Sequence, residues 1–156
     1  MKKAIIVGGG IGGLATAVAL TRRGWHLEVL ERSSRFAEVG AGLSVWPNAL
    51  RALDALGLGE TARAHALSQG QAGIRDSAGR WLSRTDTADL ERRYGQTVMM
   101  RRADLLDVLK EALPSSTLRG GTTVSHVGAD GVVVHSAGTS RADLVVGADG
   151  IRSTAR

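Results

Sequence analysis

Apolar residues along the chain gather in short runs of strand length and in longer stretches with helical spacing. Residues 4–7 form a continuous, mostly β-branched run, as in a strand buried on both faces of a parallel sheet. After five glycines, apolar positions recur on one helix face over residues 14–21, and Gly24 follows as a helix stop. Residues 26–30 form the next apolar run. The pattern therefore predicts a strand–helix–strand unit at the start of the chain.

The middle of the chain alternates helical and strand patterns. Pro47 begins a predicted helix, which Gly57 ends. Residues 71–84 predict a hairpin, because two short strands flank a turn-rich tetrapeptide. Residues 85–96 are polar and are predicted to be a loop. A strand at residues 97–101 and a helix at 103–113 complete this part.

The last third of the chain is predicted to be β-rich. Residues 122–127 and 132–135 are joined by Asp130-Gly131, the strongest short hairpin signal. A final apolar strand at 142–146 leads into Gly147-Ala148-Asp149-Gly150. This ending does not continue the strand–helix alternation of a six-stranded dehydrogenase sheet. The predicted fold class is α/β, a Rossmann-like domain with a βαβ start and inserted β-hairpins.

A dinucleotide fingerprint lies inside the first strand–helix–strand unit. Gly8 permits a tight turn, Gly10 lets a pyrophosphate approach the backbone, and Gly13 lets the helix pack closely on the strands. The N-terminus of that helix would then face the phosphates. Glu31 ends the second strand, where a carboxylate can accept hydrogen bonds from ribose hydroxyls. Because all these parts are in register, a nucleotide site is favoured over an accidental glycine-rich turn.

Composition narrows the class of protein further. Hydrophobic residues make up 43% of the 156 residues, so the chain is expected to fold. It has no cysteine, which excludes disulfides and suits a cytoplasmic location. Residues 1–20 have a superficial likeness to a signal peptide, but five glycines disfavour an apolar helical segment. No membrane span is expected, because no glycine-free apolar run approaches about 18 residues.

The net charge of +5 raises nucleic acid as a partner. The arginines are scattered, however, and aromatic residues make up only 3% of the chain, too few for a base-stacking surface. We therefore expect no nucleic-acid partner. The histidines show no metal-ligand spacing, so no metal site is predicted. No nucleophile–base arrangement stands out either, and the catalytic residues stay unknown.

Three blocks of sequence occur in order along the chain. They are VGGGIGGLATAVAL with LER, GAGLSVWPNALRALDALGL followed by MRRADLLDVL, and DLVVGADGIRSTAR. Together they resemble the FAD-dependent aromatic-ring hydroxylases, the para-hydroxybenzoate hydroxylase-like flavoprotein monooxygenases. Residues 40–58 are most similar to members of the salicylate and urate hydroxylase type. The resemblance implies that residues 1–156 form the N-terminal part of an FAD/NAD(P)-binding domain, incomplete at its C-terminus. It also implies that residues 71–100 begin a substrate-domain insertion.

The resemblance also implies which residues contact FAD. The pyrophosphate contacts would be Gly8, Gly10, Gly12, Gly13, Asp149 and Gly150. The adenosine contacts would be Glu31 at the ribose, Arg32 beside the adenine and the backbone of Val124 at the adenine edge. Ser44 would reach the flavin side, and Arg102 would approach the phosphates or the ribityl chain of the cofactor.

Several of these positions have plainer interpretations. Arg101 could replace Arg102 at the cofactor, or both could be solvated charges at a helix start. The hydroxyl of Ser44 could bond its own backbone, and Asp149-Gly150 is by itself an ordinary turn.

The implied function is cofactor binding for an NAD(P)H-dependent monooxygenase that hydroxylates an aromatic or heteroaromatic small molecule. FAD would carry the oxygen chemistry, with NAD(P)H as transient reductant. The choice of NADH or NADPH and the substrate are left open. The alternative is a non-catalytic or truncated dinucleotide-binding module. A chain lacking the rest of its domain is also expected to associate through an unpaired strand edge and to show little hydroxylation alone.

Overall fold

The structure is a computed structural model that describes residues 2–34, 36, 42–67 and 72–156. The chain divides into two compact units. The first unit contains Met1–Gly40 and Ala103–Arg156, and the second contains Ala41–Arg102.

The first unit is built on a parallel four-stranded sheet in the order β11-β1-β2-β7. These strands are β1 (Lys3–Val7), β2 (His26–Leu30), β7 (Leu118–Arg119) and β11 (Leu144–Gly147), and α1 (Ile11–Thr21) connects β1 to β2. The predicted strand–helix–strand unit is therefore confirmed. β7 was not predicted, because a two-residue strand leaves no periodic pattern in the sequence.

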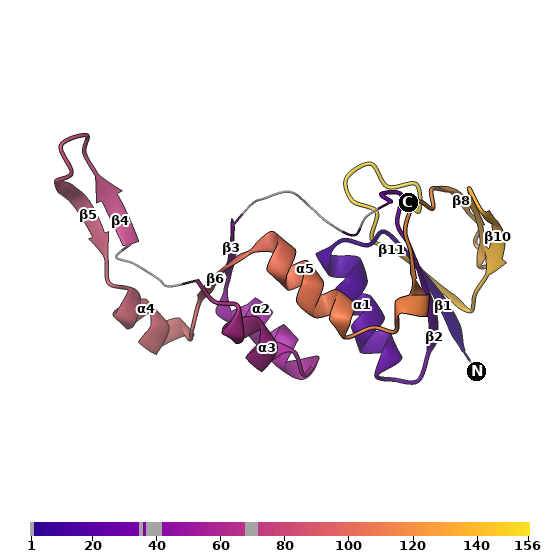
Figure 1. Cartoon of the computed structure of the whole chain (residues 1–156), viewed down its shortest axis with the longest axis horizontal. Helices are drawn as coiled ribbons and strands as arrows, with labels where there is room; N and C mark the ends of the chain where they lie inside the picture. Colours follow the sequence, from indigo (N-terminus) through magenta and orange to yellow (C-terminus); the bar gives the residue numbers. More distant parts are fainter. Residues whose placement is uncertain (1, 35, 37–41, 68–71) are drawn as a thin grey trace. The chain divides into compact units, whose positions relative to one another are not determined.

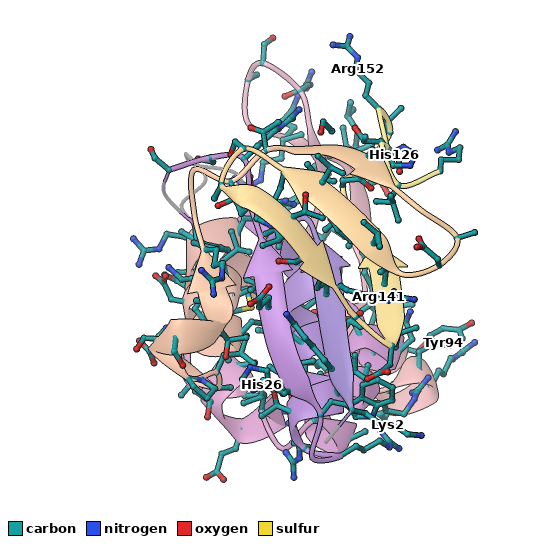
Figure 2. The ribbon with its side chains drawn as sticks, turned by 90° about the vertical axis from the view of Figure 1, so that its right-hand side faces the viewer. Lys2, His26, Tyr94, His126, Arg141 and Arg152 are labelled. Atoms are coloured by element: carbon teal, nitrogen blue, oxygen red, sulfur yellow. The ribbon has the colours of Figure 1, made fainter. Side chains whose placement is uncertain are left out.

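Two different layers cover the two faces of the parallel sheet. α1 and α5 (Arg102–Glu111) lie on one side, and β8 (Val124–Val127), β9 (Val132–His135) and β10 (Gly138–Arg141) lie on the other (Figure 1). Figure 2 shows the latter three strands in front of the parallel sheet. They form an antiparallel sheet in the order β10-β9-β8. Of these, β10 was not among the strands predicted from the sequence.

The apolar run of β1 is continuous because both of its faces are buried. Ile5 and Val7 join a core cluster with Leu30, Val124 and Val133 between the two sheets. The alternate residues of β1, Ala4 and Ile6, are also fully buried. Each large apolar side chain buried in this way contributes about 1.5–3 kcal/mol. The sandwich of helices, parallel sheet and antiparallel sheet thus fixes the position of β1 and of the turn that follows it.

Within residues 42–67 and 72–102, the second unit holds two small antiparallel sheets and three helices. β3 (Gly42–Val45) pairs with β6 (Val98–Arg101), and β4 (Ala72–Arg75) pairs with β5 (Trp81–Thr85) as the predicted hairpin. The helices are α2 (Pro47–Ala55), α3 (Gly59–Ala64) and α4 (Thr87–Tyr94). A short 3-10 turn, η1 (Ser115–Thr117), belongs to the first unit.

The helix α4 corrects the prediction of a loop at residues 85–96. The Asp86 side chain caps the helix by accepting a hydrogen bond from the Asp89 N–H at 2.8 Å. The Asp89 carboxylate pairs with Arg92 at 3.0 Å and Arg93 at 2.7 Å, and Gly95 ends the helix at a φ of +98°. None of the residues of α4 is buried. A helix that buries no face leaves no apolar period in the sequence, so the pattern of apolar residues could not predict it. The cap and the ion pairs stabilise α4 instead.

Among the described residues, no helix has the length and apolar character needed to cross a lipid bilayer.

Candidate functional site at the carboxyl edge of the parallel sheet

Three turns meet where the parallel strands of the first unit end. β1, β2 and β11 are neighbours with the same direction, so the segments that follow them lie at one edge. The Gly8 N–H donates to the Leu30 carbonyl at 2.8 Å, and the Ala148 N–H donates to the Val7 carbonyl at 2.7 Å. Figure 2 shows Arg152, which follows the third turn, at the opposite end of the unit from Lys2 and His26. Ligands of open parallel sheets bind at such an edge.

The glycines of the first turn fall into two kinds. A Cβ on Gly8 would collide with the Ala148 carbonyl, and a Cβ on Gly13 would collide with the Gly8 carbonyl. Gly8 also has a φ of +106°. By contrast, a Cβ on Gly10 or Gly12 would meet no atom within 4 Å. The first kind lets the backbone close up, and the second leaves the open space that a pyrophosphate of FAD needs.

The start of α1 lies in this open space without a capping side chain. Gly10 is the N-cap residue, and its carbonyl accepts the Leu14 N–H at 2.9 Å. The first turn of the helix contains no acidic residue. Its N–H groups and positive end are therefore available to an anion, which fits the phosphates of a dinucleotide.

Glu31 lies directly beside the glycine turn. Its Oε2 accepts a hydrogen bond from the Gly9 N–H at 2.7 Å, and its Oε1 accepts one from the Ser33 N–H at 2.8 Å. The half-buried carboxylate is thus next to the turn, as ribose recognition requires. Arg32 follows it and is exposed.

Asp149 uses its carboxylate to hold the end of the described chain. It accepts hydrogen bonds from Ser153 Oγ at 2.7 Å, from the Thr154 N–H at 2.6 Å and from the Ala155 N–H at 3.2 Å. Burial alone would raise the pKa of Asp149, but these hydrogen bonds outweigh it and hold the pKa below its ordinary value near 3.8. A direct contact between this carboxylate and FAD stays a prediction. Gly150, with a φ of +83°, completes the turn.

Val124 is the first residue of β8, and a contact of its backbone with the cofactor stays a prediction. Its side chain is 9% exposed and belongs to the core cluster. The nearby Thr122 N–H donates to the Glu31 carbonyl at 2.8 Å, so the segment that enters β8 runs next to Glu31. This arrangement fits a role for the Val124 backbone at an adenine edge.

Ser44 and Arg102 belong to the second unit. The Ser44 hydroxyl donates to Met99 Sδ at 3.0 Å rather than to its own backbone. Arg102 is the first residue of α5, half-buried, with its Nε atom buried. Contacts of these two residues with the cofactor stay predictions, as does the choice between Arg101 and Arg102.

The structure adds residues that sequence reasoning missed. The sequence predicted no contact for Gly9, although its N–H donates a hydrogen bond to the Glu31 carboxylate. Ala148 provides the backbone that packs on Gly8, and Ser153 and Thr154 hold Asp149. The serine four positions after an aspartate was an available signal for the Ser153 contact, whereas Thr154 donates its backbone N–H, for which the sequence gives no signal. No sequence signal distinguishes Gly9 from its neighbours.

The part of the chain that the structure describes contains no candidate metal site. Within it, no three residues among histidine, aspartate and glutamate gather as metal ligands would.

Comparisons with known proteins match this chain to an FAD-binding family and to enzymes named for aromatic compounds. A family profile described as "FAD binding domain" matches residues 1–156. The chain is 42% identical over 153 residues to a 2-heptyl-3-hydroxy-4(1H)-quinolone synthase of Mycobacteroides abscessus, covering 97% of this chain and 40% of the relative. It is 37% identical over 164 residues to a 3-hydroxybenzoate 6-hydroxylase of Klebsiella oxytoca, covering 99% of this chain and 41% of the relative.

A solved structure extends the comparison to the fold. The crystal structure of Klebsiella pneumoniae HpxO complexed with FAD and uric acid superposes with a TM-score of 0.85 at 31% identity. The match covers 98% of this chain and 40% of that one. The chain therefore spans about 40% of the length of the relatives it matches.

Proposed function

Because the chain belongs to the family of FAD-binding domains, we propose that it is the cofactor-binding part of a flavoprotein monooxygenase. The proposed enzyme uses NAD(P)H and oxygen to hydroxylate an aromatic or heteroaromatic small molecule. Bound FAD supplies the redox and oxygen chemistry that amino-acid side chains lack. The residues of this chain bind the cofactor and orient it.

One observation carries the proposal. The glycine turn, Glu31 and the turn at residues 148–150 gather at one edge of the parallel sheet. The open space at Gly10 and Gly12 lies at the uncapped start of α1. A dinucleotide laid along this edge would meet helix N–H groups at its phosphates and a carboxylate at its ribose.

The printed names of the relatives support the substrate class. One relative is named as hydroxylating 3-hydroxybenzoate, another is named as synthesising the quinolone given above, and the solved neighbour holds uric acid. All three compounds contain an aromatic or heteroaromatic ring with polar substituents. We therefore propose a substrate of this class for the present enzyme.

The proposal assigns roles to the remaining residues of the site. Arg32 would lie beside the adenine, and the backbone of Val124 would meet its edge. Ser44 and Arg102 would approach the flavin side and the phosphates. Asp149 would act on the pyrophosphate side chiefly through the shape of its turn, because three donors already bond its carboxylate.

Two broader features belong to the same proposal. The exposed β4–β5 hairpin supports residues 71–100 as the beginning of a substrate-domain insertion. The absence of cysteine from the sequence supports a cytoplasmic setting, where NAD(P)H is supplied.

Titration of the purified chain with FAD and with NAD tests the cofactor assignment. We expect FAD to bind clearly and NAD to bind more weakly, measured by quenching of flavin fluorescence and by calorimetry. Clear binding of NAD with none of FAD would overturn the assignment.

The reaction is tested by supplying FAD, NADH or NADPH, oxygen and a panel of hydroxybenzoates, quinolones and purines. Mass spectrometry would then search for a product that has gained one oxygen. Most of the residues assigned here would hold the adenine and pyrophosphate end of FAD. Productive hydroxylation also needs water to be excluded around the reacting ring. We therefore expect this 156-residue chain to consume NAD(P)H with hydrogen peroxide as the main product. Stoichiometric hydroxylated product would show that its active site is larger than the assigned residues.

A further inference from the structure

We propose that Glu31 is a positioning residue for the glycine turn, holding it in the cofactor-binding shape before any nucleotide arrives. This role is additional to ribose recognition. It rests on the proposed function only in that the turn receives the phosphates of the cofactor.

The two carboxylate oxygens of Glu31 bridge two separate turns. Oε2 accepts from the Gly9 N–H at 2.7 Å, and Oε1 accepts from the Ser33 N–H at 2.8 Å. Gly9 is buried, so its N–H has little access to water as an alternative partner. Hydrogen bonds of this length to an ionised carboxylate are stronger than neutral ones. The side chain therefore links the turn after β1 to the turn after β2.

The main chain of Glu31 is itself fixed on both sides. Its N–H donates to the Arg119 carbonyl at 2.9 Å, and its carbonyl accepts from the Thr122 N–H at 2.8 Å. The Ser33 carbonyl accepts from the Gly121 N–H at 2.8 Å. Glu31 is thus anchored to β7 and to the segment that follows it, and these main-chain bonds fix the position from which its carboxylate bonds Gly9.

The glycine turn is the part of the site that most needs such support. It contains Gly8, Gly9 and Gly10 in succession, and glycine loses more conformational freedom on ordering than any other residue. A Cβ on Gly9 would collide with the ring of Phe36 and lie 3.1 Å from the Glu31 Cβ. The turn therefore packs directly against the residue that bonds it.

The positioning role leaves room for the ribose. An ionised carboxylate offers about four acceptor sites on its two oxygens. Gly9 and Ser33 use one site on each oxygen. The two sites that remain equal the number of hydroxyls on the adenosine ribose of FAD. One side chain can therefore hold the turn and bind the ribose at the same time.

The variant Glu31→Gln separates these roles with little change in shape. An amide offers one acceptor oxygen and one donor NH₂, so it cannot accept from both Gly9 and Ser33. The matched control is Glu28→Gln on β2, the strand that ends just before Glu31. The Glu28 carboxylate pairs with Lys3 at 3.5 Å and Arg119 at 3.1 Å, both outside the glycine turn.

Two nucleotides separate a lost ribose contact from a loosened turn. ADP carries both ribose hydroxyls, and 2′,3′-dideoxy-ADP carries neither, although both carry the pyrophosphate. We expect Glu31→Gln to weaken 2′,3′-dideoxy-ADP by about 3- to 10-fold, the effect of losing one hydrogen bond that shapes the turn. ADP should weaken further, and Glu28→Gln should leave both within about 2-fold. If Glu31→Gln weakens ADP but leaves 2′,3′-dideoxy-ADP unchanged, Glu31 is only a ribose ligand and the proposal is wrong.

A measurement without any ligand decides the same question independently. We expect the Gly9 amide hydrogen to exchange at least about 10-fold faster in Glu31→Gln than in the wild type or in Glu28→Gln. Unchanged exchange at Gly9 would overturn the proposal. If Glu31→Gln does not fold, Glu31→Asp takes its place, because its shorter side chain keeps the charge but cannot span both turns. If the wild type binds neither FAD nor ADP, the proposed function fails, while Gly9 exchange still tests the positioning role.

Discussion

The two units of the chain use their apolar residues in different ways. In the first unit, both faces of β1 are covered and the core cluster fills the space between two sheets. In the second unit, α4 and the β4–β5 hairpin bury almost nothing. Most of the exposed large apolar side chains belong to this second unit, namely Trp46, Leu67, Ile74, Leu82, Leu90, Tyr94 and Met99.

The first unit buries most of its large apolar side chains within itself, whereas the second unit leaves many of them exposed. The close backbone contacts of Gly8 and Gly13 lie at the edge of the first unit that is assigned to FAD. Exposed apolar residues in such number are typical of a surface that meets other protein. They support the proposal that residues 71–100 begin a substrate domain.

The largest expected effect is in the glycine turn of the first unit. Gly13→Ala would place a methyl group against the Gly8 carbonyl, so the free energy of unfolding should fall by about 3 kcal/mol and FAD binding should be lost. Gly12→Ala is the matched variant, because its methyl group enters open space. It should keep the stability within about 1 kcal/mol and still weaken FAD by at least about 10-fold. Denaturant unfolding and flavin fluorescence measure both effects. Wild-type FAD affinity in Gly12→Ala would show that this space does not hold the cofactor.

The next effect concerns the turn held by Asp149. Asp149→Asn loses part of three hydrogen bonds to a charged group and should cost about 1–3 kcal/mol of stability in the first unit. The pKa of Asp149 is lowered in the folded chain, so its contribution is complete above the unfolded pKa and is lost as the pH falls through the folded pKa. The stability gap between wild type and variant should therefore close below about pH 4. A gap that is constant from pH 7 to pH 3 would contradict this cause.

A smaller effect is expected in the second unit at Asp86. Asp86→Ala removes the cap of α4 and should cost about 1 kcal/mol, confined to that helix. FAD affinity should not change. Amide exchange along α4 and a flavin titration would check both statements. A loss of FAD affinity would contradict the assignment of cofactor binding to the first unit.

The smallest effect is expected for the ion pair between Asp54 and Arg63. Arg63 binds both oxygens of Asp54, at 2.6 and 2.9 Å, and this hydrogen bonding holds the pKa of Asp54 below its ordinary value. Both groups are at the surface, where salt and water weaken such pairs. Asp54→Asn should lower the melting temperature only slightly at pH 7 and not at all well below the ordinary pKa of aspartate. A large drop at pH 7, or one insensitive to salt, would contradict a surface pair.

The sequence predicted the first unit better than the second for a physical reason. The strand at 26–30 matches β2 from end to end, because burial on a sheet leaves a clear apolar run. The hairpin at Asp130-Gly131 was found from its turn dipeptide. α4 was missed because its stability comes from a cap and ion pairs, which leave no apolar period. In the site, the glycines and Glu31 were predictable from spacing. The bond between Glu31 and Gly9 was not, because it depends on how two turns approach in space.

The central claim is that FAD binds at the edge where β1, β2 and β11 end. The most direct test is the change in backbone amide ¹H–¹⁵N signals of the labelled chain on addition of FAD. We predict the largest shifts at residues 8–13, 31–33 and 148–150, with smaller ones at β8 and little change in the β4–β5 hairpin. Shifts confined to the second unit, with the signals of Gly10 and Gly12 unmoved, would contradict it.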